Sequence, residues 1–416
     1  MTDFDSFVAY FHVESFKDAF AAKWELAMKE NPPEKYARTF LAPAALEANW
    51  KMSSFREDSL PQLQVMADRI AKSDELLTLA AYMHWRIFLD KDPDGQWQWP
   101  DLHFCFGDVE IGCFNFVVAL GFLPEYTARQ RELGIPEDVI AESRVQIPCY
   151  AFNFHRSTGM AGVFINQLSW LHCYMPPARY YRLGRLEFQY AVYRHPYKVY
   201  RNKTDGATVA LCLAGTWLTA AGEACFTDAD RPADAWETTL DERSDGVEGY
   251  AVMTDGHVAR DSVFLPSDEW ECVLSGGDSV LAMHIPTGGG MKPELVIDSL
   301  KRSFAFFDKY YPDKPVKAIF CSSWIFSNQL SECLPAESNI LALQKMVHLV
   351  PLSSAKYSGL WFVFLKNPPF EFAALPRDTS MRRDIAAWLE KGNEFHAGGM
   401  YIMREEVSRL CNRQKD

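Results

Sequence analysis

Apolar residues recur every three to four positions through most of the first 175 residues, a spacing that places them on one face of an α-helix. The segments with this pattern are long and contain many strong helix formers. They span residues 7–29, 63–88, 114–133 and 163–174. The pattern predicts an N-terminal half that is built from helices.

From about residue 180 the pattern changes to short apolar or alternating runs, which are typical of β-strands. Strands are predicted at 182–195, 207–218, 250–253, 258–265, 280–285, 316–320 and 360–365. Thr254-Asp255-Gly256 separates two of them and predicts a hairpin, because Asp-Gly readily supplies positive φ angles. Helices are predicted at 293–311, 338–348 and 379–391.

This change of pattern predicts a two-domain chain. A helical domain is expected at residues 1–178, and an α/β (α+β) domain with a mixed sheet at residues 179–416. A chain of 416 residues is also too long for one small core, which agrees with this division.

The segment 279–324 has an order of elements that can form a ligand site. An apolar run is followed by Gly288-Gly289-Gly290, an amphipathic helix pattern and a second apolar run. Amides in the glycine turn and at the helix N-terminus could hold a pyrophosphate, and Lys292 could add a positive charge. The alternative is an ordinary strand-to-helix connection that glycine makes flexible. The turn matches neither a Walker loop nor G-x-G-x-x-G spacing.

Three side chains near these strands are candidates for catalysis. His284 ends a predicted strand and is either a general base with a pKa near neutrality or a structural histidine. Glu187 lies in an apolar, aromatic strand, so it is either a base or the buried ion-pair partner of Arg185 on the same face. Cys321 is either a buried thiol or the covalent nucleophile of a thioester hydrolase.

Composition and charge narrow the function classes. With 48% hydrophobic and 23% charged residues, the chain has the composition of a globular protein. A net charge of −13 disfavours nucleic acids and anionic membranes as partners. No window of about 18 residues is apolar and free of charge, so no membrane span is expected. The N-terminus lacks signal-peptide features, and the ten cysteines include no C-x-x-C. These features predict a cytoplasmic location. No metal site is expected, because the histidines never occur with H-x-x-x-H spacing.

Several segments resemble one family and occur in its order. They are YRLGRLEFQ at 181–189, the turn at 254–256, VLAMHIPTGG at 280–289, FCSSW at 320–324 with LPAESNILALQ at 334–344, and LPRDTSM at 375–381. The chain resembles the bacterial acyltransferase domain-containing proteins, which join an N-acyltransferase N-terminal helical domain to a GNAT-like C-terminal domain.

The resemblance implies an N-acyltransferase that moves an acyl group from acyl-CoA to a small-molecule amine acceptor. In that fold the strands at 280–285 and 316–320 splay apart, and acyl-CoA enters the wedge between them. By this resemblance His284, Ser322 and Ser323 line the wedge, and Gly288–Gly290 stand where the pyrophosphate loop should be.

The chain also departs from the pattern of that family. GNAT pyrophosphate loops usually read Q/R-x-x-G-x-G/A, whereas this chain has P-T-G-G-G-M-K. The segment 338–348 contains no tyrosine to protonate the leaving thiolate. The alternative prediction is therefore a catalytically inactive GNAT-like protein that binds or senses a small ligand.

Overall fold

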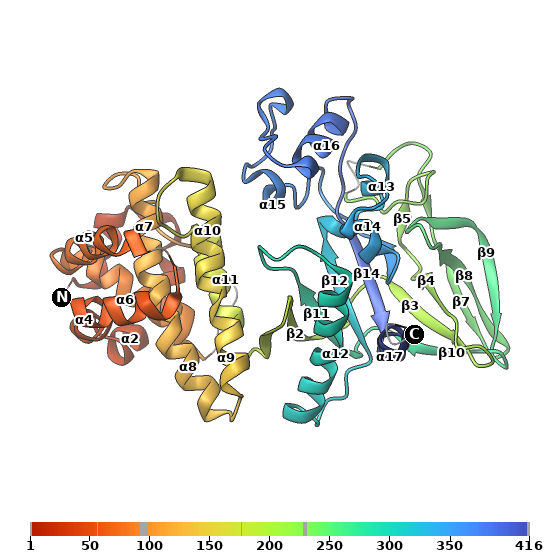
Figure 1. The fold of residues 1–416 in the computed structure, drawn as a ribbon, viewed down its shortest axis with the longest axis horizontal. Helices are drawn as coiled ribbons and strands as arrows, with labels where there is room; N and C mark the ends of the chain where they lie inside the picture. The colour runs from red at the N-terminus through yellow and green to blue at the C-terminus, as the bar shows by residue number, and fades with distance from the viewer. Residues whose placement is uncertain (1, 56, 92–97, 176, 228–230, 414–416) are drawn as a thin grey trace. The chain divides into compact units, whose positions relative to one another are not determined.

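The computed structural model describes residues 2–55, 57–91, 98–175, 177–227 and 231–413, which form two compact units (Figure 1). Unit 1 comprises Met1–Leu183 and Pro286–Gly288, and unit 2 comprises Gly184–Ile285 and Gly289–Asp416. Unit 1 is helical and unit 2 is built around a mixed sheet and an antiparallel sheet, which confirms the predicted fold class. Residues 179–183 group with the helices of unit 1 in this division.

The helices of unit 1 mostly follow the predicted segments but are divided into shorter pieces. They are α1 (Phe4–Phe11), α2 (Lys17–Glu30), α3 (Pro33–Tyr36), α4 (Pro43–Ser53), α5 (Leu60–Ala71), α6 (Asp74–Phe88), α7 (Asp108–Leu120), α8 (Phe122–Glu132), α9 (Glu137–Arg144), α10 (Gln146–Thr158) and α11 (Ile165–Trp170). The single helix predicted at 63–88 is wrong, because the Ser73 side chain accepts a hydrogen bond from Leu76 N and starts α6 as a separate helix.

Helix α6 forms the centre of unit 1, and its residues from Leu76 to Phe88 are all buried. The stretch Asp108–Glu132 is, among the described residues, the one long and apolar enough to cross a membrane by length and composition. However, 78% of its apolar window is buried inside the protein. Such burial is typical of a core helix in a globular unit.

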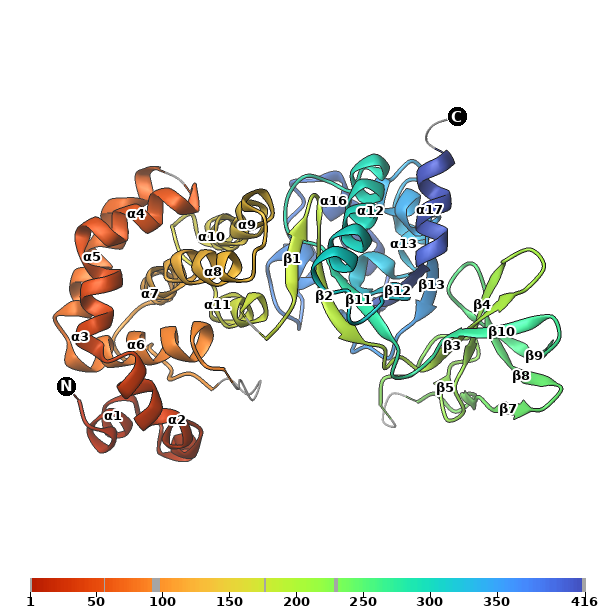
Figure 2. The ribbon, with the colours of Figure 1, turned by 90° about the horizontal axis from the view of Figure 1, so that it is seen from below.

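The central sheet of unit 2 carries the strand–turn–helix–strand segment. Its strands in spatial order are β2 (Leu186–Val192), β11 (Ser279–His284), β12 (Ala318–Ser323), β14 (Gly398–Met403) and β13 (His348–Pro351). Strands β11 and β12 are parallel, and the other neighbours are antiparallel. Helices α12 (Pro293–Tyr310) and α17 (Arg404–Arg413) lie side by side against this sheet (Figure 2).

A second sheet packs on the central sheet through a shared apolar core. Its path is β10 (Trp270–Leu274), β3 (Tyr197–Asn202), β4 (Thr208–Cys212), β8 (Gly246–Val252) and β7 (Leu240–Arg243), and β9 (Val258–Pro266) pairs with β8. The predicted hairpin is confirmed, with Gly256 at φ +85° in the turn between β8 and β9. Tyr193, Tyr197, Phe320 and Val350 belong to the core between the sheets.

The remaining elements include two corrections. The strand predicted at 360–365 is wrong, since α15 (Trp361–Phe364) forms there and packs in an apolar cluster with α16 (Ser380–Leu389). A short apolar run does not distinguish a strand from a buried helix. The helix predicted at 338–348 ends early, as α14 (Asn339–Gln344), and His348 begins β13. The other short elements are α13 (Leu330–Cys333), β1 (Tyr180–Leu183), β5 (Trp217–Leu218) and β6 (Trp236–Glu237).

Candidate active site in the wedge between β11 and β12

Strands β11 and β12 separate before either one ends. Their pairing runs from Val280 opposite Ala318 to Ala282 opposite Phe320 and then stops. Beyond that point β11 still pairs with β2, and β12 still pairs with β14 as far as Ser323. The two strands therefore diverge at their C-terminal ends, as the resemblance implied. We call the opening between these ends the wedge.

The strand register shows which candidate side chains face the same side of the sheet. Paired residues share a face, and successive residues along a strand alternate between faces. His284 lies directly opposite Glu187. Ala282 and Phe320 are paired and therefore share a face. His284 and Ser322 each lie two residues further along their strands, so both are on that same face. That face therefore carries Glu187, His284 and Ser322, whereas Cys321 points to the opposite face.

His284 and Glu187 form a cross-strand pair at the edge of the wedge. Residues directly opposite each other in an antiparallel pair have Cβ atoms about 5 Å apart. The Nε2 atom of His284 is buried, and this desolvation lowers the pKa of His284 to about 4. The near-neutral pKa expected from the sequence is therefore wrong. The ring is uncharged at pH 7, so it can accept a proton, although it is a weaker base than a solvated imidazole.

Glu187 is 2% exposed, and the start of its strand is fixed by α12. Ser299 Oγ on α12 accepts hydrogen bonds from the amides of Arg185 at 2.8 Å and Leu186 at 3.3 Å. The side chain of Arg185 turns to the glycine loop, where its Nε donates to the Gly290 carbonyl at 2.6 Å. The ion pair of Arg185 with Glu187 stays a prediction.

The glycine turn has a backbone that explains its three glycines. Gly288, Gly289 and Gly290 have φ angles of +98°, +73° and +64°. Glycine adopts such angles without a steric cost, so conformation alone accounts for the residue type. No carbonyl among the described residues accepts a hydrogen bond from these three amides. Helix α12 then begins at Pro293, with the exposed Lys292 at its N-cap.

The two polar residues at the end of β12 differ in their surroundings. Cys321 is 3% exposed, and burial raises the pKa of its thiol well above the usual value. It is therefore protonated at neutral pH and is not a ready nucleophile. Ser322 is exposed and lies two residues after Phe320, the last residue of β12 that pairs with β11. The wedge thus brings together Glu187, His284 and Ser322 but not the Cys321 thiol.

The structure adds one imidazole that the sequence analysis did not single out. The ring of His195 stacks on Phe320, with 3.3 Å between ring centroids and 18° between planes. Burial lowers the pKa of His195 to about 4. Phe320 is the last residue of β12 that pairs with β11, so His195 lies at the base of the wedge. No sequence pattern indicates this residue, because its position depends on how the chain turns between β2 and β3.

The described residues contain no candidate metal centre. No group of three or more His, Cys, Asp or Glu side chains there is arranged to hold a metal ion. The residues available to this site are therefore an imidazole–carboxylate pair, hydroxyl groups and backbone amides.

Comparison with known proteins identifies the family. The GNAT-like C-terminal domain family matches residues 180–401. A solved acyltransferase in complex with CoA and 10C-teicoplanin is similar at a TM-score of 0.62 and 19% identity, covering 96% of this chain and 99% of that one. An acyltransferase in complex with decanoyl-CoA and teicoplanin has a TM-score of 0.61 at the same identity and coverage. No curated protein matches significantly. The chain belongs to the family of proteins with a GNAT-like C-terminal domain.

Proposed function

We propose that this protein is an acyltransferase that moves an acyl group from acyl-CoA to the amine of a small-molecule acceptor. The observation that carries this proposal is the divergence of β11 and β12 beyond Ala282 and Phe320. The fold adds support, because two solved acyltransferases of similar fold are described as complexes with CoA or decanoyl-CoA. Their 19% identity makes this a likeness of fold, so the residues of this chain must carry the chemistry.

The glycine turn and the N-terminus of α12 suit the pyrophosphate of CoA. The amides of Gly288–Gly290 are available to a ligand, and α12 extends over 18 residues from Pro293. A helix N-terminus carries a partial positive charge, which favours a bound phosphate. Lys292, exposed at the N-cap, would add a charge-assisted hydrogen bond.

The wedge suits the acyl-transfer step. The acceptor nitrogen attacks the thioester carbonyl, so a C–N bond forms, the C–S bond breaks and CoA leaves as a thiolate. The nitrogen loses a proton, which the uncharged His284 ring can accept. Glu187, directly opposite on β2, would stabilise the imidazolium that results. The proton can then pass to the thiolate, which balances the reaction.

Two variants test these roles, His284→Ala and Glu187→Gln. We expect His284→Ala to lower the release of CoA in the presence of an amine by about 100-fold or more, since general bases contribute that much. Glu187→Gln should lower it by a smaller factor. Binding of acyl-CoA, measured by isothermal titration calorimetry, should change little in either variant. His103→Ala, at an exposed histidine of unit 1, is the matched control.

The competing function is ligand binding without catalysis. The low pKa of His284, about 4, favours it, because such an imidazole is a weaker base. A wild-type protein that binds acyl-CoA but releases no CoA with any amine would support this alternative. If His284→Ala instead releases CoA at the wild-type rate, His284 is not the base.

A further inference from the structure

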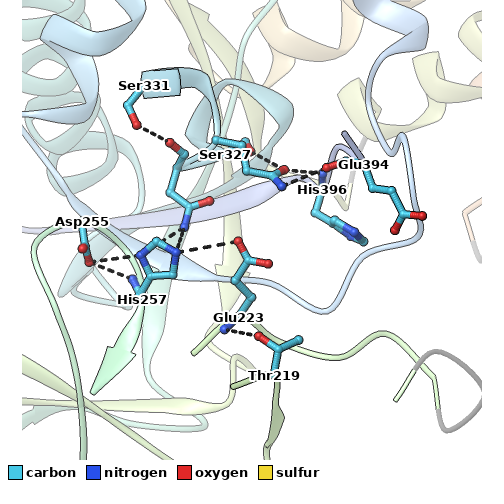
Figure 3. Close-up of polar contacts among 10 residues, drawn as sticks. Thr219, Glu223, Asp255, His257, Ser327, Ser331, Glu394 and His396 are labelled. Atoms are coloured by element: carbon cyan, nitrogen blue, oxygen red, sulfur yellow. Dashed lines mark hydrogen bonds and ion pairs between the residues drawn. The ribbon is translucent and has the colours of Figure 1, made fainter. Parts of the chain in front are cut away.

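A pocket of about 640 Å³ lies within unit 2 and plays no part in the chemistry described above. It is lined by residues from the segment after β5, the hairpin turn at Gly256, the segment after β12, the end of β13 and the start of β14. Figure 3 shows four of its lining residues, Thr219, Glu223, Glu394 and His396, with polar neighbours. A concave site of this size with several converging polar groups is typical of a small-molecule site.

The strand register places this pocket next to the wedge. Ser322 of β12 is opposite Gly399 of β14, and Gly399 is opposite Val350 of β13. Val350 lines the pocket and therefore points to the same face of the sheet as Ser322. Two strand spacings separate these residues, which is roughly 10 Å. A ligand in the pocket could therefore extend to the reacting atoms in the wedge.

Glu223 is an acidic group of this pocket that faces a histidine rather than a lysine or arginine. Its carboxylate is one-third exposed and lies 3.7 Å from His257 Nε2 (Figure 3). Asn328 Nδ2 lies 2.9 Å from the same Nε2 atom, and Asp255 lies 3.4 Å from Nδ1. Within the described part of the chain, no lysine or arginine lies in salt-bridge distance of Glu223.

The other carboxylate that lines the pocket is already neutralised. Glu394 forms an ion pair with Lys356 at 2.7 Å. Its main-chain carbonyl accepts a hydrogen bond from Gln329 Nε2 at 2.9 Å, and Gln329 Oε1 accepts from the amide of His396 at 2.8 Å. These bonds hold the segment that carries Glu394 and His396 against the start of α13.

His396 offers the pocket a second acceptor. Its Nδ1 lies 3.2 Å from the Ser354 carbonyl, which can only accept, so Nδ1 carries the ring proton. Nε2 then holds a lone pair, and no hydrogen bond to it forms among the residues that the structure describes. The carboxylate of Glu223, which has no lysine or arginine partner among the described residues, and the Nε2 atom of His396 both favour a ligand that donates hydrogen bonds.

We propose that this pocket binds a cationic end of the acceptor, with Glu223 contacting an ammonium group and His396 accepting a hydrogen bond. The inference rests on the proposed acyl transfer and names its substrate class. The acceptor is a polar molecule with two amines, one acylated in the wedge and one held in the pocket. Because the pocket lies roughly 10 Å from Ser322, the two amines must be well separated.

Straight-chain diamines of four, eight and twelve carbons test this proposal against monoamines of equal length. Binding to the full chain saturated with CoA is measured by isothermal titration calorimetry. The longer diamines should bind about tenfold or more tightly than their matched monoamines, as expected for a hydrogen bond between charged groups. Glu223→Gln should abolish this preference, and His396→Gln should weaken it. Glu242→Gln, at an exposed carboxylate paired with Lys198, should preserve it.

The outcomes separate this inference from the proposed function. Equal binding of diamines and monoamines by the wild type, or a preference that persists in Glu223→Gln, overturns the pocket assignment. The same diamine titration without CoA, together with a titration of acyl-CoA alone, shows which proposal has failed. If acyl-CoA does not bind, acyl transfer fails, whatever the diamines do.

Discussion

His284 and Glu187 were singled out separately in the sequence, and the register of β2 and β11 makes them a pair. The sequence could suggest each residue, since each interrupts an apolar strand with a polar group. It could not predict the pairing, because a shift of one residue in the register would place them on opposite faces. The same alternation separates Cys321 from Ser322, although they are adjacent in the chain.

Cys321→Ala tests that separation. Since the thiol is buried on the opposite face from His284, acyl transfer should stay within about twofold of the wild type while the free energy of unfolding falls by about 1 kcal/mol. CoA release with an amine and urea denaturation are the two measurements. Loss of CoA release at unchanged acyl-CoA affinity would restore the covalent-thiol mechanism.

The low pKa of His284 predicts the pH dependence of the reaction. A base with a pKa of about 4 is deprotonated above that pH and loses activity only as the pH falls through it. We therefore expect kcat to be flat between pH 5 and 8 with a weakly basic aromatic amine, whose own ionisation does not intervene. An inflection near pH 6.5 that His284→Ala removes would show that the ring is not desolvated.

At the scale of elements, local patterns predicted the strand–turn–helix–strand unit well. The predicted helix at 293–311 is α12, and the predicted strands at 280–285 and 316–320 are β11 and β12 with shifted ends. Strand β14 was missed, although it pairs with both β12 and β13. Its GGMYIM sequence begins with two glycines and has no alternation, so only its partners in the sheet define it as a strand.

The turn between β11 and α12 supplies a prediction of its own. The φ of Gly288, +98°, lies outside the left-handed region open to other residues, whereas the +64° of Gly290 lies inside it. Gly288→Ala should therefore weaken acyl-CoA binding more than Gly290→Ala, by about 1 kcal/mol or more. Calorimetric titration gives both affinities, and thermal denaturation verifies that both variants are folded. Equal affinities would mean that the turn does not shape the site.

In unit 1, an ion-pair network joins two helices. Asp90, just after α6, pairs with Arg86 and with Lys23 of α2, and the Asp90 and Arg86 side chains are only 3% and 4% exposed. Asp90→Asn should destabilise the protein by about 3 kcal/mol, because it leaves buried positive charge without its counter-ion. Asp68→Asn, which breaks an exposed pair with Lys72, should cost less than about 1 kcal/mol. If urea denaturation shows that Asp90→Asn and Asp68→Asn lower the free energy of unfolding by similar amounts, the buried network is contradicted.

At the scale of the whole molecule, the change from helical to strand periodicity was sufficient to predict a helical unit followed by a mixed-sheet unit. The pocket around Glu223 could not be predicted in this way. Glu223, His257, Asn328 and His396 come from segments far apart in the chain, and none of them stands in a recognisable motif. Only the pairing of the strands and the turns between them bring these side chains together.

The central claim is that the protein binds acyl-CoA in the wedge, with its pyrophosphate at the glycine turn. Isothermal titration of the full chain with acetyl-CoA and longer acyl-CoAs tests it most directly. We predict saturable one-to-one binding that Gly288→Ala weakens and Cys321→Ala leaves unchanged. The absence of binding up to millimolar acyl-CoA, or binding that both variants leave intact, would contradict the claim.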